Sequence, residues 1–196
     1  MSSVLWYGQL LLAMVLLYVA WSCLEYLAHR YLMHATCAIP FATHHRLHHS
    51  ATRSDMTLDK HRDGYATLGK QENLCMTGWE SLAMYAAGFL MVVPCVALVG
   101  AKIRSSITVF TAIFALCLTI YTNVTWNTIH PLTHGQTQSI CGKLVLQNPT
   151  LIQNPLFAWL QRNHRAHHYF KGTEKGNYNV TLPGADFLFG TYRVIP

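Results

Sequence analysis

The stretch VLWYGQLLLAMVLLYVAWSCL, residues 4–24, runs directly into EYLAHRYLMH, residues 25–34, and this junction decides the fold. The first stretch contains no Asp, Glu, Lys or Arg, and it is long enough for a helix to cross a bilayer, which takes roughly 20 apolar residues. The second stretch carries two histidines just beyond the apolar residues. We therefore expect a membrane helix whose end presents histidines at one membrane surface.

Two further windows, residues 81–101 and 105–125, are free of charged side chains and predict two more membrane helices. The composition agrees, because only 11% of the residues are charged, against about 25% in an ordinary soluble domain. A fourth uncharged window, residues 144–161, is broken by two Asn-Pro pairs, which favour an interfacial segment over a span. The sequence thus predicts an all-α integral membrane protein, a single domain over residues 1–196, with about three transmembrane helices.

The order of these spans determines which side of the membrane each histidine faces. We interpret the first as a retained anchor, because it lacks the basic start and the small-residue cleavage site of a signal peptide. The third is expected to leave the hydrocarbon near Trp126. With a hairpin at residues 100–105, the chain returns to its histidine-bearing side before His130. All histidine clusters then face one compartment, in a cap of short helices and loops.

Charge indicates which compartment this is. Only Lys102 and Arg104 of the fourteen basic residues lie in the hairpin tip, so positive-inside bias places the histidine-rich cap of a multi-pass membrane protein in the cytosol. Topology and anionic headgroups explain the net charge of +6, and no basic run interleaved with aromatic residues indicates nucleic-acid binding. The six cysteines show no C-x-x-C pair and are expected to be free packing thiols.

Ten of the twelve histidines form four clusters. Two clusters repeat the spacing H-x-x-H-H, in HRLHH and HRAHH, and on a helix the positions i, i+3 and i+4 share one face. Neutral imidazole is the commonest metal ligand in proteins, and ten imidazoles are too many for one ion. We therefore interpret the clusters as ligands of two metal ions: His29, His34, His45, His48, His49, His130, His134, His164, His167 and His168.

The two wide pairs differ from the H-x-x-H-H motifs. His29 and His34 lie about 140° apart around a straight helix, which suits ligands of two different metals. The pair His130 and His134 encloses Pro131, so either the third span ends at His130 or its helix kinks there.

Other residues near the clusters have more ordinary interpretations. The last motif is expected on a helix at the membrane surface that starts with Asn154 as N-cap and Pro155 in its first position. His44 is interpreted as an outer partner of the metal site or as solvent-exposed, and His61 as a surface residue. Glu25 either tunes a ligand or caps the end of a membrane helix, and the sequence leaves both open.

The segment EYLAHRYLMH, residues 25–34, resembles the E-Y-x-x-H-R-x-x-x-H box of the fatty acid hydroxylase and sterol desaturase superfamily. HRLHH, WNTIHPLTH and NHRAHH follow in the order of that family, and the segments KGNYNV and DFLFGT are similar to its C-terminal part. The resemblance covers roughly residues 25–193. It is specific, because four boxes must coincide in order.

Members of this superfamily are integral membrane, di-iron, oxygen-dependent enzymes of lipid metabolism. The resemblance implies that the ten clustered histidines hold two iron ions and that dioxygen is the co-substrate. Zinc is also an acceptable guest for imidazole, so zinc in purified protein would not identify it as the working metal. The resemblance further implies an oxidoreductase that hydroxylates a lipid taken from the bilayer, in the endoplasmic reticulum if the source is a eukaryote. Electrons are expected from a separate protein, such as cytochrome b5 or a ferredoxin with its reductase, because no cytochrome b5-like domain is fused.

Spacing within the boxes is closest to fatty acid and ceramide 2-hydroxylases. Their first box has four intervening residues, whereas sterol C4-methyl oxidases usually have three. Carotenoid ring hydroxylases share the longer first box, but their third box also encloses four residues, where His130 and His134 enclose three. This favours a hydroxylase of a fatty acyl chain or sphingolipid, with a lipid or sterol desaturase or a sterol C4-methyl oxidase as the alternative for the same site.

The alternative function that is not enzymatic is a histidine-rich membrane metal transporter or sensor. A transporter should carry ionisable or metal-binding residues at mid-membrane, where its substrate crosses. The second and third predicted spans carry no charged residue or histidine before His130, which favours the enzyme.

Overall fold

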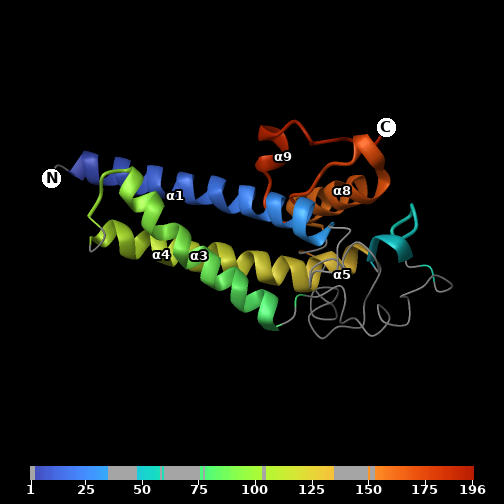
Figure 1. Ribbon diagram of the computed structural model, residues 1–196, viewed down its shortest axis with the longest axis horizontal. Coiled ribbons are helices and arrows are strands. Elements are labelled where there is room, and N and C mark those ends of the chain that lie inside the picture. Colours follow the sequence, from blue (N-terminus) through green and yellow to red (C-terminus); the bar gives the residue numbers. More distant parts are fainter. Residues whose placement is uncertain are drawn as a thin grey trace.

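Three long helices form the body of the computed structural model (Figure 1). They are α1 (Ser3–Leu27), α3 (Gly78–Leu98) and α4 (Ser106–Val124), which pack against one another. The structure describes residues 3–34, 48–57, 59, 76, 78–102, 105–134, 150 and 153–196. All regular elements of these described residues are helical, as the sequence predicts.

Two of the long helices continue beyond their α-helical part. A π-helix, η1 (Ala28–Met33), extends α1, and the π-helix η4 (Thr125–Ile129) followed by α5 (His130–Thr133) extends α4. Three helical stretches are then long and apolar enough to cross a membrane: Ser3–Met33, Gly78–Leu98 and Ser106–Thr133. The prediction of three such helices is confirmed and indicates membrane association, although the first and third helices extend further than the predicted spans.

Pro131 is accommodated without ending the third helix. A proline inside an α-helix removes one backbone hydrogen bond, and its ring clashes with the carbonyl four residues earlier. Here the wider turns of η4 end directly before His130, and Pro131 lies in the first turn of α5. His130 keeps a right-handed helical backbone, with φ of −58° and ψ of −50°. The third span therefore does not end at His130, and a change of helix type precedes the proline.

The core lies between the three long helices. Leu17 and Trp21 of α1 pack with Val96 of α3 and Leu118 of α4, and the Trp21 indole nitrogen donates to Thr122 Oγ1 at 3.0 Å. The outer faces are also apolar, with many large hydrophobic side chains exposed on all three helices, such as Leu90. A helix that is apolar on every face is typical of a membrane span.

Gly88 allows α3 to approach its neighbours closely. A Cβ atom there would lie 2.7 Å from Thr119 Oγ1 and 2.9 Å from a Trp21 ring carbon. We expect Gly88→Ala to lower the midpoint of thermal unfolding in detergent, because overpacking costs about 1–3 kcal/mol. Gly8→Ala is the control, since nothing lies within 4 Å of its added Cβ. Equal midpoints for both variants would contradict the tight packing at Gly88.

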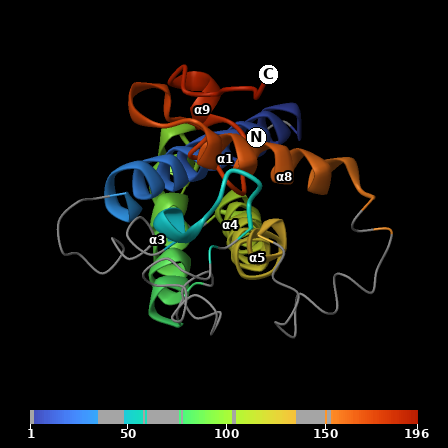
Figure 2. The ribbon, with the colours of Figure 1, turned by 90° about the vertical axis from the view of Figure 1, so that its right-hand side faces the viewer.

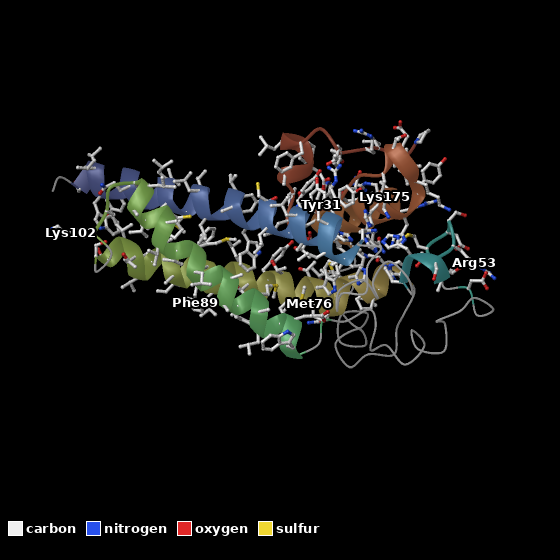
Figure 3. All side chains as sticks on the ribbon, viewed as in Figure 1. Tyr31, Arg53, Met76, Phe89, Lys102 and Lys175 are labelled. Atoms are coloured by element: carbon white, nitrogen blue, oxygen red, sulfur yellow. The ribbon has the colours of Figure 1, made fainter. Side chains whose placement is uncertain are left out.

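The C-terminal part of the chain covers one end of this bundle. It contains α8 (Pro155–Tyr169), the 3-10 turn η5 (Gly172–Glu174) and α9 (Ala185–Leu188). Figure 2 shows α8 running across the end of the long helices, and α9 packs against α1. The start of α8 is as predicted, because Asn154 Oδ1 accepts from the Leu156 backbone N–H at 2.8 Å and Pro155 occupies the first turn. Lys102 lies at the opposite end of the bundle (Figure 3).

Candidate metal centre

Nine of the ten predicted ligands lie among the described residues, and all nine meet at one end of the bundle. They come from η1 and the residue after it, from residues 48–49, from α5 and the residue after it, and from α8. Figure 3 shows the resulting concentration of nitrogen atoms beside Lys175. His45 lies outside the described residues, as do His44 and His61.

The first set, called group A here, consists of His29, His34, His49 and His167, one potential ligand atom of each lying within 4.8 Å of the others. Three of its imidazoles approach one another through their Nε2 atoms. His167 Nε2 lies 3.1 Å from His34 Nε2 and 3.1 Å from His49 Nε2. Four histidines from three separate parts of the chain therefore converge on one point.

The second set, called group B here, consists of His48, His130, His134 and His164, which are all buried and meet the same 4.8 Å limit. His134 Nε2 lies 2.8 Å from His164 Nε2. His168 adjoins this group, because its Nε2 lies 3.1 Å from His48 Nε2 and 3.2 Å from His164 Nε2. His48, His49 and His168 also form a third set, so groups A and B are neighbours.

The spacing of these nitrogens fits metal coordination. A metal–nitrogen bond of about 2.0–2.1 Å and a right angle between two ligands place the two nitrogens about 3 Å apart. The Nε2 separations of 2.8–3.2 Å match that value. Both groups could therefore hold a metal ion.

Backbone carbonyls orient three of the rings. His29 Nδ1 lies 2.7 Å from Tyr178 O, His167 Nδ1 lies 2.8 Å from Gly176 O, and His134 Nδ1 lies 3.1 Å from Met56 O. A carbonyl oxygen can only accept, so each Nδ1 must carry the proton and donate. The Nε2 lone pair of each ring is then left for a metal, which is the usual arrangement around ligating histidines.

Burial also keeps three of the histidines, His134, His164 and His167, in their neutral form. Desolvation lowers the pKa of His134, His164 and His167 well below 6.5, with neighbouring histidines lowering it further. Burial lowers the pKa of Lys175 to about 8, and its Nζ lies 2.8 Å from His34 Nδ1. At neutral pH the three histidines therefore have the protonation state that metal binding requires.

The π-helix η1 changes the role expected of the first wide pair. The His34 backbone N–H donates to the His29 carbonyl at 3.2 Å, an i to i+5 hydrogen bond. This wider turn brings the two imidazoles to one side of the helix, with ring centroids 5.0 Å apart, and both belong to group A. The expectation that His29 and His34 reach two different metals, which assumed a straight α-helix, does not hold in this geometry.

An apolar cavity of about 200 Å³ adjoins group A on the side of the long helices. Apolar side chains make up most of its surface, and His29 forms part of its wall together with Glu25 and Glu80; the apolar residues include Trp21, Leu24, Met84 and Trp126. On the other side, a cleft of about 1140 Å³ contains polar and charged residues and reaches His34, His49, His167, His168 and Lys175. The histidines thus lie between an apolar cavity and a polar cleft.

Several partners of the histidines were not singled out from the sequence. The carbonyls of Met56, Gly176 and Tyr178 belong to the backbone, which carries no residue-type signal. Asp186 is 2% exposed and accepts hydrogen bonds from two backbone N–H groups near Tyr178. Its position in DFLFGT was the one available hint, because that segment contributed to the family resemblance.

Comparisons of the chain with protein-family models, with curated proteins and with solved structures found no match.

Proposed function

We propose that this protein is a non-haem di-iron oxygenase of the fatty acid hydroxylase and sterol desaturase type, which hydroxylates a fatty acyl chain or sphingolipid. One observation carries the proposal. His29 belongs to group A and also forms part of the wall of an apolar cavity between membrane-length helices. A hydrocarbon chain in that cavity would lie next to a metal ligand.

The two histidine groups would each hold one iron ion. Nitrogen-rich donor sets suit iron and zinc alike, so the choice of metal follows from the reaction and not from the ligands. Bound iron would supply the activation of dioxygen by two external electrons. Overall, one dioxygen, two electrons and two protons convert a C–H bond into C–OH, and the second oxygen atom leaves as water.

The chain itself would position the lipid and exclude water. Trp21, Leu24 and Met84 give the cavity an apolar wall, which favours a hydrocarbon over water. A chain held there presents one carbon to the histidine side, and proximity of this kind is a large part of catalysis. The polar cleft on the other side would admit the separate electron donor, in our proposal cytochrome b5 or a ferredoxin.

Lipid mass spectrometry tests this proposal. Cells expressing the chain, together with a competent electron donor, are compared with cells expressing the His167→Ala, His168→Ala double variant. We expect lipids that have gained one oxygen atom only with the intact chain, because the double variant removes a ligand of group A and one that adjoins group B. Equal membrane insertion of both forms is checked first, and His61→Ala serves as a histidine control.

Any other outcome would indicate a different function or would contradict the ligand assignment. Lipids that have lost two hydrogens would identify a desaturase with the same site. Oxygenated lipid from the double variant would contradict the ligand assignment. An unchanged lipid profile from a metal-loaded chain with a working electron donor would favour the metal transporter or sensor.

A further inference from the structure

We propose that the C-terminal strap, defined as residues 175–182, assembles one of the two metal positions, that of group A, and acts on group B only through the position of α8, which carries His164. Glu25 and Asp186 act as positioning residues that hold the strap. The inference rests on the proposed metal centre, and the experiment below separates failure of the one from failure of the other.

Three of the four histidines of group A have their Nδ1 contact on this strap. Lys175 Nζ lies 2.8 Å from His34 Nδ1, Gly176 O accepts from His167, and Tyr178 O accepts from His29. The Tyr178 ring also packs edge-on against the same three imidazoles, with centroid distances of 5.5–5.9 Å. Three residues of the strap, Lys175, Gly176 and Tyr178, therefore contact three of the four histidines of group A.

In group B, His134 has its corresponding contact elsewhere. His134 donates its Nδ1–H to Met56 O at 3.1 Å, and Met56 belongs to the described segment 48–57. His130 and His134 are carried by α5, the continuation of α4. Moving the strap would therefore disturb group A first.

The Glu25 carboxylate binds the strap to α1. It accepts from the Thr181 backbone N–H at 2.7 Å through Oε1 and from the Leu182 backbone N–H at 3.0 Å through Oε2. Glu25 lies four residues, about one helical turn, before His29 on the same helix. The residue that holds the strap and the histidine that the strap orients are thus close neighbours.

The Asp186 carboxylate also binds the strap. Oδ1 accepts from the Tyr178 backbone N–H at 3.0 Å, and Oδ2 accepts from the Asn179 backbone N–H at 2.6 Å. Thr191 Oγ1 donates to Oδ1 at 2.7 Å. Buried backbone N–H groups outside helices and sheets need such partners, and charge-assisted hydrogen bonds are the stronger kind.

Two asparagines connect the strap to α8. Asn163 Nδ2 donates to the Asn179 carbonyl at 2.7 Å, and Asn177 Nδ2 donates to Asn163 Oδ1 at 2.8 Å. Asn163 lies four residues before His167, just as Glu25 lies four residues before His29. The strap is therefore hydrogen-bonded both to α1, whose continuation η1 carries His29, and to α8, which carries His167. These are the two histidines whose Nδ1–H groups donate to carbonyls of the strap.

Metal stoichiometry tests the inference. Purified wild-type chain and the Glu25→Gln variant are loaded with Co²⁺ alone, and bound metal per chain is measured by elemental mass spectrometry and by cobalt absorption. We expect about two ions for the wild type and about one for Glu25→Gln. The variant keeps the size of the side chain. Its amide NH₂ group, however, must face one of the two backbone N–H groups that donate to the wild-type carboxylate, and two donors cannot form a hydrogen bond with each other.

Double variants identify the position that is lost. Adding His29→Ala to Glu25→Gln should leave the count at one, because both changes act on group A. Adding His164→Ala should reduce it to none, because His164 belongs to group B. Glu174→Gln is the matched control, since its carboxylate is exposed next to the strap and lies 3.9 Å from Arg193. It should bind two ions.

Two further variants keep the test informative if Glu25→Gln does not fold. Asp186→Asn should also bind one ion. Thr191→Val keeps both carboxylates but removes one hydrogen bond to Asp186, and it should raise the Co²⁺ concentration needed to fill group A. Group B should fill as in the wild type.

Two ions bound by Glu25→Gln with wild-type affinity would overturn the inference and leave the metal centre standing. Loss of both ions from a folded Glu25→Gln variant would show that the strap supports the whole site and would overturn the selectivity. A wild-type chain that binds no metal would overturn the proposed function as well.

Discussion

Replacing His164 with alanine is expected to reduce product formation to less than about one hundredth of the wild-type level. His164 is fully buried, and its Nε2 lies 2.8 Å from His134 Nε2 and 3.2 Å from His168 Nε2. Its removal takes away one of the four histidines of group B. Loss of a mere outer partner of a metal site already costs 10–100-fold in affinity or activity, so the loss of a ligand should exceed that range.

The measurement combines lipid product analysis with metal content in the same preparation. Gln161→Ala is the control, because Gln161 is exposed and lies on the same helix one turn earlier. Membrane insertion should be unchanged in both variants, since the three apolar helices do not include α8. Normal metal content and normal product from His164→Ala would remove His164 from the ligand set.

Replacing Gly176 with alanine is expected to have the second largest effect. A Cβ atom on Gly176 would lie 1.9 Å from the Thr191 carbonyl oxygen and 3.1 Å from its carbonyl carbon, and both are backbone atoms. The strap must therefore move, and the Gly176 carbonyl that accepts from His167 Nδ1 moves with it. We expect loss of the group A metal, loss of product, and destabilisation by about 1–3 kcal/mol, which is typical of overpacking.

Cobalt content, product formation and thermal unfolding should be measured together for Gly176→Ala. Gly78→Ala is the matched control, because nothing lies within 4 Å of the Cβ atom it would add. The control should behave as the wild type in all three measurements. A Gly176→Ala variant with two bound ions would show that the strap tolerates displacement and that the contact to His167 is dispensable.

The sequence predicted only part of the site. The close approach of Gly176 to Thr191 is one feature that it could not predict, because the contact depends on the tertiary fold. Helical periodicity predicts that His164, His167 and His168 share one face of α8 and therefore point toward one place. The structure instead divides them, because His167 belongs to group A and His164 to group B. His48 and His49 are adjacent in the sequence, yet they belong to groups B and A respectively. Their assignment depends on where α5 and α8 lie in space, which no local pattern contains.

The chain by itself determined its three long apolar helices and the start of α8 at Asn154. These features follow from the length of uncharged stretches and from a cap that satisfies nearby backbone N–H groups, and both are local. Only the tertiary structure decided that η1 aligns His29 with His34, and that Tyr178 O, 149 residues away along the chain, orients His29. The physical reason is that helix type and carbonyl partners depend on long-range packing, and backbone atoms are alike at every position.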